Sequence, residues 1–252
     1  MANLHARTDI AYGEHPRQRF DLFCPQDVRE SRPLVVCVHG GWWQSGWRED
    51  LLVLALRLAE AGWPAATIGY RLLESTGDGA GIQADLRAAV TTALEENLVL
   101  GGTGRSVVLV GAGAGGLTAL GLAAASAGDH EVLVQGVACY GTAPSLQAWD
   151  GCTSEVAKQL AIYAGDKAQD LDPSLQAADR FPPVLLVHGD ADKEVPVGPG
   201  REFYRKLIEA DDPAKLQVLA GVGHHALDAA HGRGFTDCVD RICDWLRELQ
   251  RG

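Results

Sequence analysis

The sequence predicts one α/β domain, in which helices cover both faces of a mostly parallel sheet. Apolar stretches of strand length alternate with amphipathic helical patterns along the 252 residues, and this alternation is typical of a parallel sheet. No linker rich in Pro and Ser, no charge block and no repeat divides the chain, so we expect a single domain over residues 1–252. Glycine-rich segments follow several predicted strands, at the edge where such sheets bind ligands.

The predicted elements follow from hydrophobic periodicity and turn residues. Two strands at 10–12 and 18–23 form an opening hairpin, which would supply an antiparallel edge. Continuous apolar runs predict buried strands at 33–39, 64–70, 106–110, 131–140, 183–188 and 214–220. Helical spacing predicts helices at 48–61, 82–98, 115–127, 200–210 and 235–250. The less regular segment 142–180, with a helical piece at 154–163, is predicted to be a short lid or insertion that covers the site.

Composition excludes several classes of function. A net charge of −11 argues against a nucleic-acid partner, because such proteins need a clustered basic face. The N-terminal residues lack the apolar core of a signal peptide, and no apolar run is long enough to span a membrane. The six cysteines are scattered and form no C-x-x-C pair, so we expect buried free thiols. We therefore expect a cytoplasmic protein with a small-molecule substrate and neither metal nor cofactor, and we leave a homodimer open.

One stretch organises the rest of the chain, namely residues 106–120, which read SVVLVGAGAGGLTAL. An apolar β-branched run ends abruptly in Gly111, Gly113, Gly115 and Gly116, and a helical pattern rich in Ala and Leu begins at Leu117. This order predicts a buried strand, a very tight turn and a helix. A strand-to-helix turn of the form G-x-S-x-G carries a nucleophilic serine in many enzymes. In this chain the same frame holds Gly113 where the serine would stand.

Four motifs occur in a fixed order, each at the end of a predicted strand. They are His39-Gly-Gly-Trp-Trp, Gly111-x-Gly-x-Gly-Gly, His188-Gly-x-x-Asp-x-x-Val-Pro and Gly221-x-Gly-His. Together they resemble the esterase/lipase branch of the α/β-hydrolase family, over about residues 9–248. The first motif is most similar to that of small carboxylesterases and of the α/β-type kynurenine formamidases. The resemblance implies an α/β-hydrolase fold and a substrate that is a small ester or an aryl formamide.

The resemblance also assigns an acid and a base. Asp192 matches the acid that orients the catalytic histidine, and His224 matches the general base. Asp190 and His225 are neighbouring rivals for these two roles. The spacing before the Val-Pro pair favours Asp192 over Asp190. The alternative without a catalytic role is that the aspartate belongs to a turn and that the histidine is structural.

The glycine-rich loop after the first buried strand is expected to contribute to the oxyanion hole and to substrate binding. By resemblance, the backbone N–H groups of Gly41, Trp42 and Ala114 would form an oxyanion hole. Trp42, Trp43 and Trp47 cluster at the predicted mouth of the pocket. All three would stack on an apolar or aromatic acyl group, or else pack beneath the lid, and Trp43 and Trp47 are the expected substrate-binding residues.

The glycine at position 113 leaves the reaction open. Residues 111–117 carry no hydroxyl, and the nearest ones, Thr118 and Ser106, are not expected to reach the oxyanion site. Three interpretations remain. In the first, the chain is an esterase-like hydrolase that has lost its serine and is impaired in covalent hydrolysis. In the second, it uses His224 and Asp192 for acid/base chemistry without a covalent step, as a lyase, isomerase, cyclase or water-mediated hydrolase. In the third, it is an inactive binding protein on the same fold.

Overall fold

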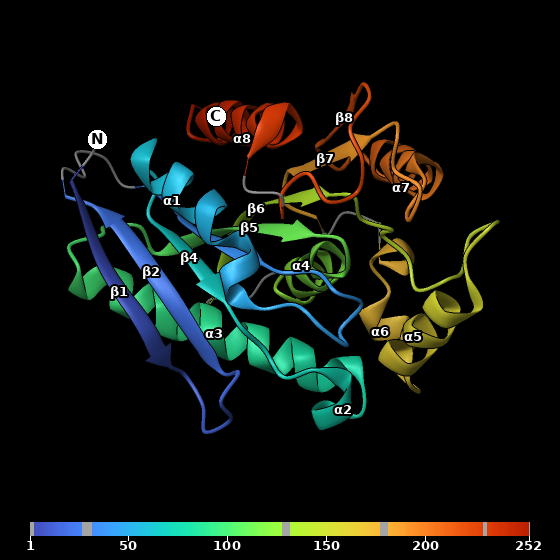
Figure 1. Cartoon of the computed structure of the whole chain (residues 1–252), viewed down its shortest axis with the longest axis horizontal. Coiled ribbons are helices and arrows are strands. Elements are labelled where there is room, and N and C mark those ends of the chain that lie inside the picture. Colours follow the sequence, from blue (N-terminus) through green and yellow to red (C-terminus); the bar gives the residue numbers. More distant parts are fainter. Residues whose placement is uncertain (1–2, 27–31, 128–131, 177–180, 229–230, 252) are drawn as a thin grey trace.

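A computed structural model describes residues 3–26, 32–127, 132–176, 181–228 and 231–251. An eight-stranded sheet forms its centre, with the strand order β1-β2-β4-β3-β5-β6-β7-β8 (Figure 1). The strands are β1 (Leu4–Ala11), β2 (Arg19–Pro25), β3 (Leu34–Val38), β4 (Ala65–Ile68), β5 (Ser106–Ala112), β6 (Leu133–Tyr140), β7 (Val184–Gly189) and β8 (Ala214–Leu219).

The strand directions agree with the sequence prediction. β1 pairs with β2 and β2 pairs with β4 in antiparallel fashion, whereas the pairs from β4 through β3, β5, β6 and β7 to β8 are parallel. The opening hairpin therefore supplies the antiparallel edge, as expected. Strands β3 and β5 are buried along their whole length, because helices cover both of their faces.

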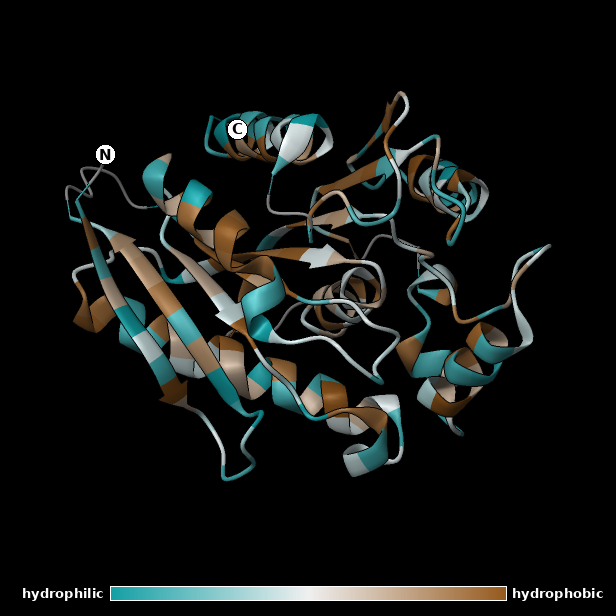
Figure 2. Ribbon diagram, in the orientation of Figure 1, coloured by the Kyte–Doolittle hydropathy of each residue, from teal (hydrophilic) through white to brown (hydrophobic). Residues whose placement is uncertain are grey.

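Helices lie on both faces of the sheet. α1 (Leu52–Glu60) and α8 (Gly232–Leu249) pack together on one face, while α3 (Gly79–Val99), α4 (Ala114–Ala125) and α7 (Val197–Glu209) lie on the other. Two separate apolar cores result, one beneath each layer of helices. Figure 2 shows the central strands mainly in hydrophobic colours and more hydrophilic colour on α8, as expected for an amphipathic surface helix.

Small residues bring α4 close to the sheet. Eleven residues of this helix are buried, and they are mostly Gly, Ala and Leu. A helix that is apolar on all sides belongs in the interior of a domain. α4 begins directly after β5 and packs against β5 and β6, so its first turn sits at the carboxyl end of the central strands.

The segment predicted as a lid is an irregular insertion between β6 and β7. It contains α5 (Ser154–Ala164), α6 (Ala168–Leu171) and a short 3-10 turn, Pro173–Leu175. Figure 1 shows it beyond the arrowheads of β5 and β6. Its last residues, 177–180, and residue 131 of the predicted sixth strand lie outside the described residues.

Most differences from the predicted elements lie at their ends, and two short helices were not predicted. The first strand, expected at 10–12, begins at Leu4. The helix expected at 48–61 is a 3-10 turn, Arg48–Leu51, followed by α1. The short helices α2 (Leu73–Thr76) and α6 were not predicted, because four residues are too few to show helical periodicity. α3 begins three residues before its predicted start, because Asp78 accepts a hydrogen bond from the Gly81 N–H and caps the helix.

Candidate active site

The four sequence motifs meet at one edge of the sheet. His39 follows β3, Gly113 follows β5, Asp192 follows the end of β7, and His224 lies in the loop after β8. Because parallel strands place their carboxyl ends on the same side, residues far apart in the sequence come together there. A fifth strand end, Gly141 after β6, joins them, although the sequence analysis did not single it out.

Gly113 forms the sharp turn between β5 and α4. Its φ of 52° and ψ of −121° are strained for a residue with a side chain. The turn lies directly against the end of β3, because a Cβ on Gly115 would collide with the backbone carbonyls of Val38 and His39. The tight strand–turn–helix that the sequence predicted is therefore present, and glycine is needed for the close approach.

His224 and Asp192 form a hydrogen-bonded pair. His224 Nδ1 lies 2.8 Å from Asp192 Oδ2, and the Asp192 side chain is completely buried. Asp192 Oδ1 accepts hydrogen bonds of 2.9 Å from the backbone N–H groups of Glu194 and Val195. Both carboxylate oxygens of Asp192 therefore have hydrogen-bond donors. Since the carboxylate accepts from Nδ1–H, Nε2 of His224 is left with a free lone pair.

The lone pair of His224 faces residue 113. A Cβ placed on Gly113 would lie 3.4 Å from His224 Nε2 and 3.8 Å from Cε1. Gly141, at a φ of 58°, packs against the pair from the other side, since a Cβ there would lie 3.1 Å from His224 Nδ1. The imidazole is thus held between Gly113, Asp192 and Gly141.

The neighbouring rivals occupy other places. Asp190 Oδ1 accepts a 2.6 Å hydrogen bond from the Gly221 N–H and so tethers the loop that carries His224. His225 points outward, with 65% of its side chain exposed, and binds the carboxylates of Glu194 and Asp228. Hydrogen bonds to these two carboxylates raise the pKa of His225. The geometry therefore favours Asp192 and His224 over Asp190 and His225.

Two buried histidines support the strand ends. His188 Nε2 donates a 2.7 Å hydrogen bond to the Val195 carbonyl and lies 3.5 Å from Asp192 Oδ2, so it packs behind the acid. His39 stacks on Tyr70 with ring centroids 4.2 Å apart, and its Nδ1 lies 2.9 Å from the Gly40 carbonyl. Burial lowers the pKa of His39 to about 4, so the ring is neutral near pH 7.

Several backbone N–H groups lie unused around the elbow. Among the described residues, those of Gly41, Trp42 and Ala114 are three of the groups without a hydrogen-bond acceptor. Gly41 has a φ of 97° and Trp42 a φ of 50°, which turn the loop back on itself after β3. A Cβ on Gly40 would lie 3.9 Å from the Ala114 nitrogen, so the loop and the elbow are neighbours.

The tryptophans separate into three environments, and the expectation that Trp43 contacts substrate is wrong. Trp43 is completely buried, stacks on Tyr163 at 4.0 Å, and donates a 2.8 Å hydrogen bond to Thr118 Oγ1. Its alternative role, packing beneath the insertion, is the one observed. Trp47 is 55% exposed, and the guanidinium of Arg17 covers its ring at 4.0 Å.

Trp42 contacts the insertion. Its ring stacks on Trp149 of the insertion, with centroids 6.1 Å apart and planes inclined by 27°. Trp149 in turn forms one wall of a cavity of about 460 Å³ between the insertion and α7. Pro196, which follows the loop of Asp192, lies on the rim of the same cavity. The cavity is connected to the loop of Trp42 through the ring contact with Trp149, whereas His224 lines a separate hollow with Gly223 and Phe235. Neither was foreseen from the sequence.

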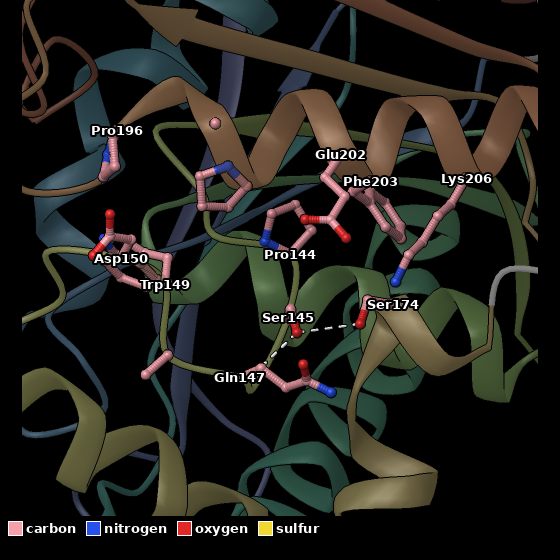
Figure 3. Close-up of a pocket in the computed structure, with 13 residues that line it drawn as sticks. Pro144, Ser145, Gln147, Trp149, Asp150, Ser174, Pro196, Glu202, Phe203 and Lys206 are labelled. Atoms are coloured by element: carbon pink, nitrogen blue, oxygen red, sulfur yellow. Dashed lines mark hydrogen bonds between the residues drawn. The ribbon is translucent and has the colours of Figure 1, made fainter.

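Polar and apolar groups share this cavity. Figure 3 shows Glu202, Phe203 and Lys206 projecting from α7 toward the segments that carry Ser145 and Ser174. The two serine hydroxyls lie 3.1 Å apart. Behind them, the buried Asp172 accepts hydrogen bonds from Ser145 Oγ, Leu146 N and Ser174 N, and thereby joins the two arms of the insertion.

Hydroxyl groups near the elbow are engaged elsewhere. Thr118 Oγ1 donates to the Ala114 carbonyl, and Thr142 Oγ1 lies 3.0 Å from the Gly113 carbonyl, to which it donates. Ser106 lies at the far end of β5. All three side chains are buried. Across the described ranges, no group of three or more His, Cys, Asp or Glu residues could hold a metal ion.

The rest of the described chain bears on two further expectations. Five of the six cysteines are buried, Cys152 is half-buried, and all six, each within the described ranges, are free thiols. None of the helices in the described segments is both long and apolar enough to cross a bilayer.

Comparisons with known proteins agree with this fold. The sequence model of the BD-FAE family matches residues 20–207. Isoprenylcysteine alpha-carbonyl methylesterase ICME of Arabidopsis thaliana is 24% identical over 243 residues, which cover 86% of this chain and 56% of that protein. The chain thus spans little more than half the length of this relative. Kynurenine formamidase of Danio rerio is 31% identical over 64 residues, or 25% of this chain and 22% of that protein.

Solved esterases share the architecture. Esterase B from Lactobacillus rhamnosis, determined with a tributyrin phosphonate inhibitor, superposes with a TM-score of 0.85 at 20% sequence identity. The superposition covers 98% of this chain and 86% of the esterase. This similarity supports the α/β-hydrolase fold predicted from the four motifs.

Proposed function

Because the chain belongs to the BD-FAE family and has the fold of esterase-like α/β-hydrolases, we propose that it is a hydrolase of small esters or aryl formamides whose covalent route Gly113 closes. The observation that carries this proposal is the 3.4 Å between His224 Nε2 and a Cβ on residue 113. A hydroxyl on that Cβ would come within hydrogen-bonding reach of Nε2, as a nucleophile activated by a base requires.

The charge that develops on a substrate carbonyl would be stabilised by the unused amides. The N–H groups of Gly41, Trp42 and Ala114 are the donors of the proposed oxyanion hole. A positive φ at a residue as bulky as Trp42 is strained. Such strain often marks a functional position, and here it supports a loop shaped to present amides to a ligand.

The cavity beside Trp149 is the proposed place for one side of the substrate. Its volume of about 460 Å³ suits a small molecule. Trp149 and Phe203 offer aromatic surface for the substrate class that the family resemblance implies, including an aryl group. Trp42 then contributes both an amide to the oxyanion hole and a ring that supports Trp149.

The test is to supply the missing nucleophile. Removing the serine from such a triad costs as much as about 10⁶-fold in kcat, and binding and the oxyanion hole retain part of the acceleration. We expect Gly113→Ser to raise kcat/KM for p-nitrophenyl butyrate or formanilide by at least ~10²-fold. The gain should disappear in the Gly113→Ser/His224→Ala double variant and persist in Gly113→Ser/His225→Ala.

A folded Gly113→Ser variant with no gain on either substrate would overturn the proposal. The same site would then serve non-hydrolytic acid/base chemistry or ligand binding alone. Circular dichroism and thermal melting of each variant establish that it is folded.

A further inference from the structure

We propose that the chain, with Gly113 in place, hydrolyses its substrate by direct attack of a water molecule, which His224 activates in the space that a serine side chain would fill. The inference rests on the proposed function, because it uses the same acyl substrate and the same backbone amides. The nucleophile is a water molecule instead of a serine hydroxyl, so the chain with Gly113 would itself be active.

The space beside Gly113 has the right size and the right neighbour. Apart from the residues that adjoin Gly113 in the chain, a Cβ there would have two described atoms within 4 Å. Both belong to His224, and they are Nε2 and Cε1. The Cβ would lie 3.4 Å from His224 Nε2. A water oxygen placed about 0.5 Å closer to Nε2 would be at a normal O–H···N hydrogen-bond distance. Glycine therefore leaves room for a water molecule in front of the base.

His224 is held in the orientation that the step requires. Its Nδ1 lies 2.8 Å from Asp192 Oδ2, and Nε2, which carries the lone pair of the neutral ring with a proton on Nδ1, faces residue 113. With 12% of its side chain exposed, the imidazole is largely shielded from bulk solvent. Two backbone donors fix Asp192 in turn, so the base keeps its orientation without a serine.

No hydroxyl of the elbow competes with water as the nucleophile. Thr118 and Thr142 donate to the carbonyls of Ala114 and Gly113, and both side chains are buried. Bringing either hydroxyl to the substrate would break its present hydrogen bond, at a net cost of about 0.5–1.5 kcal/mol.

The reaction balances with water as the only co-reactant. The water oxygen bonds to the carbonyl carbon while its proton passes to His224 Nε2, and the carbonyl π electrons move to the oxygen that faces Gly41, Trp42 and Ala114. The bond from carbon to the leaving oxygen or nitrogen then breaks, and that atom takes the proton from Nε2. The products are the acid and the alcohol or amine, and the chain never becomes acylated.

This route is slower than a covalent one but faster than solution. A triad that has lost a member retains about 10³–10⁴-fold acceleration over water. We expect the chain to hydrolyse p-nitrophenyl butyrate at least ~10²-fold faster than buffer, and more slowly than Gly113→Ser. Product should appear without an initial burst, and no butyryl adduct should be found by intact mass spectrometry.

Two variants and one control test the route. His224→Ala removes the base, and Gly113→Ala fills the water position, so each should reduce the rate at least tenfold, toward that of buffer. His225→Ala, which changes the adjacent exposed ring, should retain the full rate. If the positive φ of residue 113 prevents Gly113→Ala from folding, His224→Ala alone still decides the outcome.

The outcomes separate the two proposals. If the unaltered chain shows no turnover and the Gly113→Ser variant is active, the water route is contradicted and the proposed function is supported. Turnover that survives His224→Ala, or a butyryl adduct on the chain, also contradicts the route. If Gly113→Ser is folded and inactive as well, the proposed function itself is overturned.

Discussion

Gly141 is the residue through which the position of His224 can be tested without altering either member of the pair. A Cβ on Gly141 would lie 3.1 Å from His224 Nδ1, 3.3 Å from Cε1 and 3.4 Å from Asp192 Oδ2. Two of these contacts are tighter than ordinary van der Waals separations, so the imidazole must move. Because Gly141 has a φ of 58°, alanine there also adds backbone strain of about 1–2 kcal/mol.

A matched control separates strain from displacement. Gly101 has a φ of 92°, and a Cβ on it would meet nothing within 4 Å. Gly101→Ala should therefore lose only the stability that the backbone strain costs. Each kcal/mol of lost stability lowers Tm by about 2–4 °C. Gly141→Ala should lose a similar stability and, in addition, shift the base by a few tenths of an ångström. A misplacement near 1 Å would cost about 10²-fold in rate, so this smaller shift should cost less.

The assay is kcat/KM for p-nitrophenyl butyrate, measured in the Gly113→Ser background. We expect Gly141→Ala to lower it by about tenfold, equivalent to roughly 1.4 kcal/mol, because the shift is smaller than 1 Å. Gly101→Ala should leave it within about threefold. Equal kcat/KM values for the two variants would refute the reasoning that Gly141 holds the imidazole against Asp192.

Three further predictions concern the acid, the tryptophans and pH. In the Gly113→Ser background, Asp192→Asn should lower kcat by about 10³–10⁴-fold through the wrong imidazole tautomer, whereas Asp190→Asn, whose amide oxygen can still accept from Gly221 N–H, should change it little. Urea unfolding should show a loss of about 3–5 kcal/mol for Trp43→Ala and of less than about 1 kcal/mol for the exposed Trp47→Ala; similar losses would contradict the buried position of Trp43. Burial lowers the pKa of His39 to about 4, below its value in the unfolded chain, so the unfolded state binds the proton first. Stability should be full above about pH 6.5 and fall toward pH 4, on the order of 3 kcal/mol from this residue. A slope of stability against pH that is unchanged in His39→Gln would contradict this.

The sequence was sufficient for the fold because its signals are local. The apolar run before Gly113 and the small residues after it leave few arrangements other than a buried strand, a tight turn and a helix. The order of strands and helices then implies a parallel sheet, whose carboxyl edge gathers the motifs. His224 and Asp192 were identified by motif, and the structure brings them within 2.8 Å of each other.

The parts that were missed depend on long-range packing. Trp42 and Trp43 are adjacent in the sequence, yet one lies beside the cavity and the other in the core, because both have a positive φ that reverses the loop. Gly141 looked like an ordinary residue after a strand, and its importance appears only when His224 packs on it. Trp149 lies in an irregular insertion whose folding no periodic pattern predicts, so the cavity could not be anticipated.

Residue 113 lacks a nucleophile, while His224, Asp192 and the backbone amides around it are in position. Covalent labelling with a p-nitrophenyl alkylphosphonate, followed by intact mass spectrometry, tests this arrangement. We expect one phosphonyl group on Gly113→Ser, none on the unaltered chain, and none on Gly113→Ser/His224→Ala. Labelling of the unaltered chain, or a folded Gly113→Ser variant that takes no label, would contradict the account.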